Sequence, residues 1–235
     1  MIDEWGKGAK YWTKTWNPVI GCKKVSEGCE NCYAESMAKR FPSLCDENGG
    51  FTPHVTNSKK APRSGVVFVG NMTDIFGEWN RDSQICMWIY WLHEKAVNLI
   101  LTKRPQRLVR LCCSLSRVNR WYGITAENQA RYDERTNIIR QFPCHISNRW
   151  ISCEPLLSEI NLRLDSFPVK WVVVGAESGA NRRPCKLEWV ESIVQQCQKT
   201  GTPVFVKQLD IDGKLVNDIT KFPPELQIRQ IPWNR

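Results

Sequence analysis

Short apolar runs alternate with longer amphipathic stretches along the whole chain. The apolar runs are rich in Val, Ile and Trp, and several are flanked by Gly or Pro, which is typical of buried parallel strands. They cover residues 11–16, 66–70, 97–102, 121–125, 149–153, 171–175 and 203–207. We therefore expect a strand at each of these runs.

Between the predicted strands, apolar residues recur with the spacing of a helix. These helical patterns cover residues 30–41, 82–96, 105–115, 128–141 and 187–200. The last one ends before Gly201, a favoured residue just after a helix. Repeated strand–helix alternation indicates βαβ units and a parallel sheet, closed as a barrel or left open. We expect an α/β protein, a partial or near-complete TIM-like barrel of mainly parallel strands, built as one domain over residues 1–235.

Composition and charge narrow the class of protein. With 42% hydrophobic residues the chain can bury a core, which excludes a disordered or collagen-like protein. No stretch approaches the roughly 20 apolar residues of a membrane span, and residues 1–10 lack the apolar centre of a signal peptide. We therefore expect a cytoplasmic protein. The net charge of +9 favours an anionic partner such as a nucleotide or nucleic acid, with a solvated basic surface as the alternative.

Polar residues gather directly after several predicted strands. They lie in the segments 70–74, 125–128, 153–155 and 175–179. Because the carboxyl ends of parallel strands meet at one edge of a sheet, active sites form there. This pattern favours an enzyme over a structural protein.

Three cysteines, Cys22, Cys29 and Cys32, follow the first predicted strand. Cys29 and Cys32 are three residues apart, so a helical turn would put both sulfurs on one side. Gly21 and Gly28 permit the tight backbone that a loop around a metal needs. An odd total of eleven cysteines in a reducing compartment does not suggest a disulfide framework. Thiolates at this density suit zinc or the iron of an iron–sulfur cluster.

Three interpretations of this segment are open. A zinc site needs a fourth ligand, for which Cys45 or His54 could serve. Buried thiols without a metal are the second interpretation, although a loop containing Lys, Ser and Glu is a poor place to bury them. The third is an iron–sulfur cluster with three cysteine ligands and one open iron for catalysis, and the sequence favours it.

The cysteines after the first strand of a partial α/β barrel resemble the radical SAM superfamily. This resemblance implies a [4Fe-4S] cluster held by Cys22, Cys29 and Cys32 at the C-terminal mouth of the barrel, with S-adenosylmethionine chelating the fourth iron. An external electron donor such as a flavodoxin or ferredoxin would drive reductive cleavage of the cofactor to a 5′-deoxyadenosyl radical. The spacing differs from the common one, because six residues instead of three separate the first two cysteines. An aromatic residue, Tyr33, follows the third cysteine instead of preceding it.

A second resemblance covers nearly the whole chain. Segments at 15–22, 28–35, 101–105, 152–157, 175–179, 206–208 and 221–226 are similar to an uncharacterised family of phage proteins. This likeness implies a fold more than a substrate. The dipeptides Thr73-Asp74 and Thr102-Lys103 also resemble the spore photoproduct lyases, the DNA-repair branch of the radical SAM enzymes.

The radical SAM resemblance implies roles for the polar strand ends. The expected cofactor-binding residues are Tyr33, Asn71, Thr73, Asp74, Lys103, Thr125, Glu127 and Asn128. The expected catalytic or substrate-side residues are Cys153, Glu154, Glu177 and Lys207, with Cys153 as a candidate hydrogen-atom donor. The structural alternatives are helix capping for Asp74 and Asn128 and burial for Cys153. For Glu154, Glu177 and Lys207 the alternative is a salt bridge among them.

Together these observations predict a radical SAM enzyme that acts on a nucleobase, nucleotide or DNA in a phage or bacterial modification pathway. The alternative from another class is a zinc-stabilised nucleic-acid-binding protein without catalysis. The polar strand ends separate the two, since a zinc-stabilised binder has no need to collect them at one edge. No Ser/His/Asp arrangement supports hydrolase chemistry.

Overall fold

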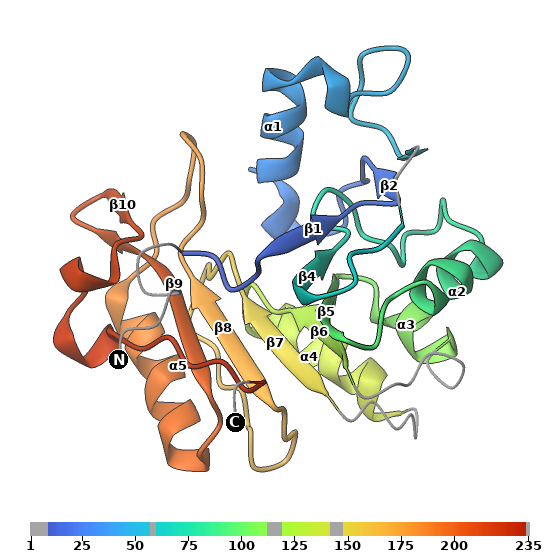
Figure 1. Ribbon diagram of the computed structural model, residues 1–235. Coiled ribbons are helices and arrows are strands. Elements are labelled where there is room, and N and C mark those ends of the chain that lie inside the picture. The colour runs from blue at the N-terminus through green and yellow to red at the C-terminus, as the bar shows by residue number, and fades with distance from the viewer. Residues whose placement is uncertain (1–8, 57–59, 112–118, 142–147, 234–235) are drawn as a thin grey trace. The chain divides into compact units, whose positions relative to one another are not determined.

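Parallel strands, most of them followed by a helix, make up the computed structural model, which describes residues 9–56, 60–111, 119–141 and 148–233 (Figure 1). The contacts divide the chain into two units. We call the first the cysteine unit, formed by the described parts of Trp12–Ile124 and Asn137–Asn148. The second, the carboxyl-terminal unit, comprises the described parts of Met1–Tyr11, Thr125–Thr136 and Arg149–Arg235.

The cysteine unit contains a parallel sheet in the order β1–β4–β5–β6. Its strands are β1 (Lys14–Trp16), β4 (Gly65–Val69), β5 (Ala96–Thr102) and β6 (Arg120–Thr125). A separate antiparallel pair joins β2 (Val19–Ile20) to β3 (His54–Val55). β4 buries Val66–Val69, and β5 buries Ala96, Leu99 and Ile100, as expected for strands inside a parallel sheet.

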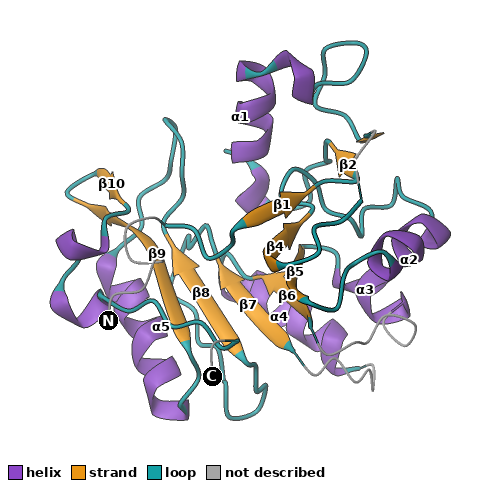
Figure 2. Ribbon diagram, in the orientation of Figure 1, coloured by secondary structure: helices purple, strands orange, loops and turns teal. Residues whose placement is uncertain are grey.

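Two helices, α2 (Asp82–Tyr90) and α3 (Pro105–Leu111), pack against this sheet (Figure 2). Trp88 of α2 and Leu108 of α3 share a buried cluster with Val67 of β4. The helix α1 (Tyr33–Arg40) follows the segment 21–32 that contains the three cysteines, which we call the cysteine segment, and it buries only two alanines. The sheet and its two helices therefore form the core of the unit, while α1 contributes little to it.

The carboxyl-terminal unit contains the last four strands of the eight-stranded sheet, among which β10 is antiparallel to β9 and the other pairs are parallel. Its strands, in spatial order, are β7 (Arg149–Cys153), β8 (Trp171–Gly175), β9 (Val204–Ile211) and β10 (Lys214–Val216). The helix α5 (Leu187–Thr200) contacts β8 and β9 through its apolar face. The larger part of α4 (Gln129–Arg140) also belongs to this unit.

Aromatic side chains from distant segments fill the core of this unit. The Tyr11 ring meets Trp150, Trp171 and Phe205 edge to face, with ring centroids 6.1, 5.1 and 5.4 Å away. The Trp171 indole N–H donates to the carbonyl oxygen of Gln230 at 2.8 Å. Edge-to-face pairs of this kind add to the stabilisation that burial of the rings provides.

The predicted elements are confirmed, with some differences of extent. The first predicted strand begins at Lys14 instead of residue 11, and the first predicted helix begins at Tyr33 instead of residue 30. The second predicted helix ends at Tyr90 instead of 96, because Ala96 pairs with Gly65 as the first residue of β5. The last predicted strand runs on to Ile211 and turns through Asp212 and Gly213, whose φ angles are 50° and 71°. An Asp-Gly pair between extended segments is a sequence signal for such a hairpin. Residues 112–115 of the third predicted helix lie outside the described residues.

The fold class is confirmed as mixed α/β with mainly parallel strands. Closure into a TIM-like barrel and the single domain over residues 1–235 stay predictions. Within the described ranges, no helix combines the length and the apolar character that a membrane crossing requires.

Replacing Trp171 with Ala is expected to lower the free energy of unfolding by about 3–5 kcal/mol. The indole is fully buried, and its loss leaves both a cavity and an unpaired Gln230 carbonyl. Urea unfolding followed by far-UV circular dichroism measures the change. Trp91→Ala is the control, since the Trp91 side chain after α2 is 51% exposed and its removal should cost about 0.5 kcal/mol or less. Equal losses in the two variants would contradict the packing argument.

Candidate functional site

The cysteine segment, residues 21–32, connects β2 to α1 in the cysteine unit. Cys29 ends a short 3-10 turn, Glu27–Cys29, and Cys32 is the residue before the first turn of α1. The side chains of Cys22, Cys29 and Cys32 are partly exposed. Gly21 has a φ of 90°, and a Cβ there would lie 2.0 Å from the carbonyl oxygen of Thr52. The predicted need for glycine before Cys22 is therefore confirmed.

The loop after β4 is fastened to this segment by hydrogen bonds. The Gly21 N–H donates to the carbonyl oxygen of Met72 at 3.1 Å, and the Thr73 hydroxyl donates to the carbonyl oxygen of Gly21 at 2.6 Å. The Asn71 amide donates to the Tyr33 hydroxyl at 2.6 Å, and this hydroxyl lies 3.2 Å from the Asn71 carbonyl oxygen. Of the predicted cofactor residues, Tyr33 and Asn71 thus contact each other, and Thr73 holds the backbone of the cysteine segment.

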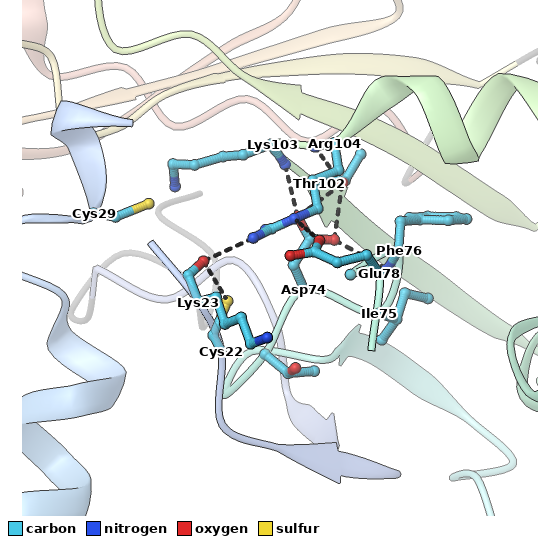
Figure 3. A network of polar contacts seen from close by, with 12 residues as sticks. Cys22, Lys23, Cys29, Asp74, Ile75, Phe76, Glu78, Thr102, Lys103 and Arg104 are labelled. Atoms are coloured by element: carbon cyan, nitrogen blue, oxygen red, sulfur yellow. Dashed lines mark hydrogen bonds and ion pairs between the residues drawn. The ribbon is translucent and has the colours of Figure 1, made fainter. Parts of the chain in front are cut away.

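A buried carboxylate, Asp74, is the centre of a polar network at the ends of β4 and β5 (Figure 3). Its Oδ1 accepts from the Phe76 N–H at 3.0 Å and from the Thr102 hydroxyl at 2.8 Å. Its Oδ2 accepts from the Lys103 N–H at 3.0 Å and lies 3.3 Å from Nη1 of Arg104. The side chain is 9% exposed, so these donors replace the water that a free carboxylate would bind. Asp74 is thus an anchor within the protein, and direct contact with a cofactor stays a prediction.

Arg104 extends this network to the cysteine segment. Its Nε donates to Glu78 at 2.9 Å, and its Nη2 donates to the carbonyl oxygen of Lys23 at 2.8 Å. The guanidinium carbon lies 4.7 Å from the centre of a Trp79 ring. The planar cation therefore has partners around its edge and an aromatic ring on one face, a geometry suited to Arg and not to Lys.

The surroundings of Cys22 favour its neutral thiol. Burial and the nearby negative charge of Asp74 raise the pKa of Cys22 to about 11. The positive charge of Arg104 and a hydrogen bond from the Asp74 N–H oppose this shift without cancelling it. A bound cation would add the charge that the thiolate needs.

The surroundings of Cys29 favour its thiolate. Burial disfavours the charged form, but the Lys103 ammonium and the hydrogen bonds from Val25 and Ser26 outweigh it. The pKa of Cys29 therefore lies below its ordinary value of 9.0. A partly exposed cysteine whose pKa is lowered by a nearby cation is typical of reactive or metal-binding sites.

The three thiols suit a metal in donor type, and Figure 3 shows Cys22 and Cys29 on the same side of the polar network. Among the residues that the structure describes, no group of three His, Cys, Asp or Glu side chains converges as a ligand set. The proposed zinc ligands have other contacts: the Cys45 sulfur lies 3.4 Å from a backbone oxygen, and Nδ1 of His54 lies 2.8 Å from another. Metal binding at the three cysteines thus stays a prediction, and it requires the segment to draw them together.

In the carboxyl-terminal unit, the residues after β6 are engaged in local contacts. Glu127 is fully buried and forms a two-pronged ion pair with Arg135. The Arg135 guanidinium also donates to the carbonyl oxygen of Thr125 at 2.7 Å. Oδ1 of Asn128 accepts from the Arg131 N–H at 2.9 Å, so the capping alternative is confirmed for Asn128. A cofactor role for these residues stays a prediction.

The charged strand ends of the same unit are paired with one another. Lys207 of β9 forms an ion pair with Glu154, which follows β7. Glu177 accepts from the Arg183 N–H at 2.8 Å and pairs with its guanidinium. The salt-bridge alternative is therefore confirmed for Glu154 and Lys207, whereas Glu177 takes a different partner.

Cys153, the candidate hydrogen-atom donor, has no exposed surface. Burial, with smaller contributions from Cys197 and Glu127, raises the pKa of its thiol well above the usual range. These properties are those of a cysteine that packs as a small apolar residue, the alternative given above. Its catalytic role stays a prediction.

Sequence reasoning did not single out Thr102 or Glu78 as site residues. Thr102 accepts from the Arg104 N–H at 2.8 Å while donating to Asp74, so it links the two charged partners. Its position directly before Lys103 at a predicted strand end was the available signal. Glu78 lies in the loop before α2, where nothing in the pattern marks it.

Alkylation of the apoprotein with iodoacetamide is expected to reach Cys29 at lower pH than Cys22, because the thiolate is the reactive form. Lys103→Gln should move the Cys29 profile to higher pH, since it removes the nearby cation that lowers the pKa. Lys170→Gln, an exposed lysine of the other unit, is the control and should leave it unchanged. Mass spectrometry of the cysteine peptides gives each rate. Identical profiles for Cys22 and Cys29 would contradict the assigned surroundings.

A family model described as "Protein of unknown function (DUF5131)" matches residues 7–220. The matched range contains the cysteine segment, the Asp74–Arg104 network and every strand from β1 to β10. No curated protein and no solved structure matches the chain. The expected membership of an uncharacterised family is confirmed, whereas kinship with the radical SAM enzymes stays a prediction. Since the match covers most of the sequence, the chain belongs to the DUF5131 family of proteins of unknown function.

Proposed function

We propose that this protein is a radical SAM enzyme. Cys22, Cys29 and Cys32 would hold a [4Fe-4S] cluster, with S-adenosylmethionine as the second cofactor. The observation that carries the proposal is the cysteine segment itself, which is fastened to the carboxyl ends of β4 and β5. When bound, the two cofactors supply one-electron cleavage of the sulfonium and a 5′-deoxyadenosyl radical.

The location of the segment supports an active site. It follows β1, and the parallel strands β1, β4 and β5 are neighbours in the sheet. Their carboxyl ends therefore meet at one edge, which is where α/β enzymes bind ligands. The residues that follow the three strands are joined by the contacts of Thr73, Asp74 and Arg104.

The charges around the sulfurs support an anionic iron–sulfur group. Cys22 receives a hydrogen bond from the Asp74 N–H, and Cys29 receives hydrogen bonds from Val25 and Ser26. Hydrogen bonds and positive charge near the sulfurs stabilise the negative charge of thiolate-bound clusters. Lys103 and Arg104 supply that positive charge, one near each of these two cysteines.

Two residues of the same unit suit the polar and aromatic parts of the second cofactor. The Lys103 ammonium is partly exposed, and a cation of this kind can hold a carboxylate. Tyr33 follows Cys32 in the sequence and is 44% exposed, and its ring offers a flat surface for an adenine. Arg104, in contrast, already has Asp74 and Glu78 as partners.

For the substrate, we propose a nucleobase, nucleotide or DNA, supported by the net charge of +9. A flavodoxin or ferredoxin would serve as the electron donor. The competing function is a zinc-stabilised nucleic-acid-binding protein, and the metal distinguishes the two.

The test is metal and sulfide analysis of anaerobically purified protein, followed by an assay for 5′-deoxyadenosine. We expect about four irons and four sulfides per chain, with an absorbance that dithionite bleaches. Cys29→Ala and Cys32→Ala should each abolish the iron content and the 5′-deoxyadenosine. Cys86→Ala, which removes a partly exposed thiol from α2, is the matched control and should retain both.

Stoichiometric zinc without iron would overturn the proposal in favour of the binding protein. Iron or 5′-deoxyadenosine that persists in both cysteine variants would also overturn it. Protein without any metal after reconstitution with iron and sulfide would leave no cluster for the proposed reaction.

A further inference from the structure

We infer that Arg104 is a positioning residue for the cysteine segment: it fastens the carbonyl oxygen of Lys23 to the end of β5 and so fixes the backbone beside Cys22. Lys23 and Arg104 are 81 positions apart in the sequence, and the bond between them is 2.8 Å long. The relevance of this anchoring for catalysis rests on the proposed function, whereas the anchoring of the segment by Arg104 does not.

Arg104 is suited to this role because it is itself held rigidly. Its N–H donates to the Thr102 hydroxyl at 2.8 Å, so its backbone is fixed at the strand end. Its guanidinium lies beside Asp74 and Glu78 and over the Trp79 ring. With a side chain only 10% exposed, it has little freedom to leave the Lys23 carbonyl.

The anchored carbonyl is directly next to the first cysteine. The Cys22 sulfur lies 3.6 Å from the same Lys23 oxygen, so the guanidinium and the thiol share one acceptor (Figure 3). On the other side of Cys22, Gly21 is held by Met72 and Thr73. The backbone is thus clamped on both sides of Cys22, and Arg104 supplies the clamp on the carboxyl side.

Loss of the clamp should release the segment without unfolding the unit. Asp74 keeps three donors when Arg104 is changed: the N–H groups of Phe76 and Lys103 and the Thr102 hydroxyl. The hydrophobic cluster beneath α2 and α3 does not include Arg104. The expected effect is therefore local to the cysteine segment.

The test is a pulse of iodoacetamide on the folded apoprotein, with mass spectrometry of each cysteine peptide. Arg104→Lys keeps the positive charge but loses the planar fork, so a change in rate reports the anchoring and not the ionisation of Cys22. We expect the Cys22 rate to rise about tenfold, the factor that corresponds to one lost hydrogen bond to a charged group. The rates at the buried Cys153 and Cys197 should stay unchanged.

Arg107→Lys is the matched control. Arg107 lies in the first turn of α3 and is partly buried, and it bonds the Asn80 carbonyl oxygen and Asp82 but not the cysteine segment. Its replacement loses comparable hydrogen bonds and should leave the Cys22 rate unchanged. If Arg104→Lys does not fold, Glu78→Gln decides, because it removes the negative charge that pairs with the guanidinium, and the Glu78 side chain is 61% exposed. It should raise the Cys22 rate by a smaller factor.

An unchanged Cys22 rate in Arg104→Lys, or in Glu78→Gln where Arg104→Lys does not fold, would overturn the inference. An equal rise in Arg107→Lys, or a rise at Cys153 and Cys197 as well, would show general destabilisation and overturn it too. None of these readings depends on iron. A protein without a cluster would thus refute the proposed function. The alkylation rates of the cysteine peptides would still test the anchoring by Arg104.

Discussion

The charge of Asp74 has to be balanced inside the protein, and much of the candidate site follows from that constraint. A buried carboxylate without partners would cost several kcal/mol. The backbone and hydroxyl donors that solve this problem come from the ends of β4 and β5, which brings these two loops together. Arg104 enters as the cation beside it and, once fixed, reaches the cysteine segment. One solvation requirement thus connects three strand ends.

Local patterns in the sequence were sufficient for the fold. The Val-rich runs of β4 and β8 are apolar on both faces, which only a covered sheet requires, and the helical spacing of α5 is equally clear. The antiparallel pair of β2 and β3 was not predicted, because each strand has only two residues. Such short strands leave no periodicity to detect.

The sequence predicted which residues lie at the candidate site, but not which side chains they contact. Asp74 and Lys103 were identified from their position after strands, and they do lie together. The same reasoning applied to Glu127 and Glu177, which are neutralised by Arg135 and Arg183. A charge at a strand end can face a ligand or a neighbouring side chain, and a linear pattern does not distinguish them. The contact between Arg104 and Lys23 spans too many positions for any local pattern to reveal it.

The conformation of Gly21 has a consequence at the level of the gene. Its backbone lies so close to the Thr52 carbonyl that a Cβ would meet it at 2.0 Å, and its φ of 90° disfavours other residues as well. Every missense change in a glycine codon introduces a side chain that has a Cβ. While the loop keeps its shape, this codon can therefore change only silently, and random mutagenesis followed by selection for folded protein should return codon 21 with synonymous changes alone.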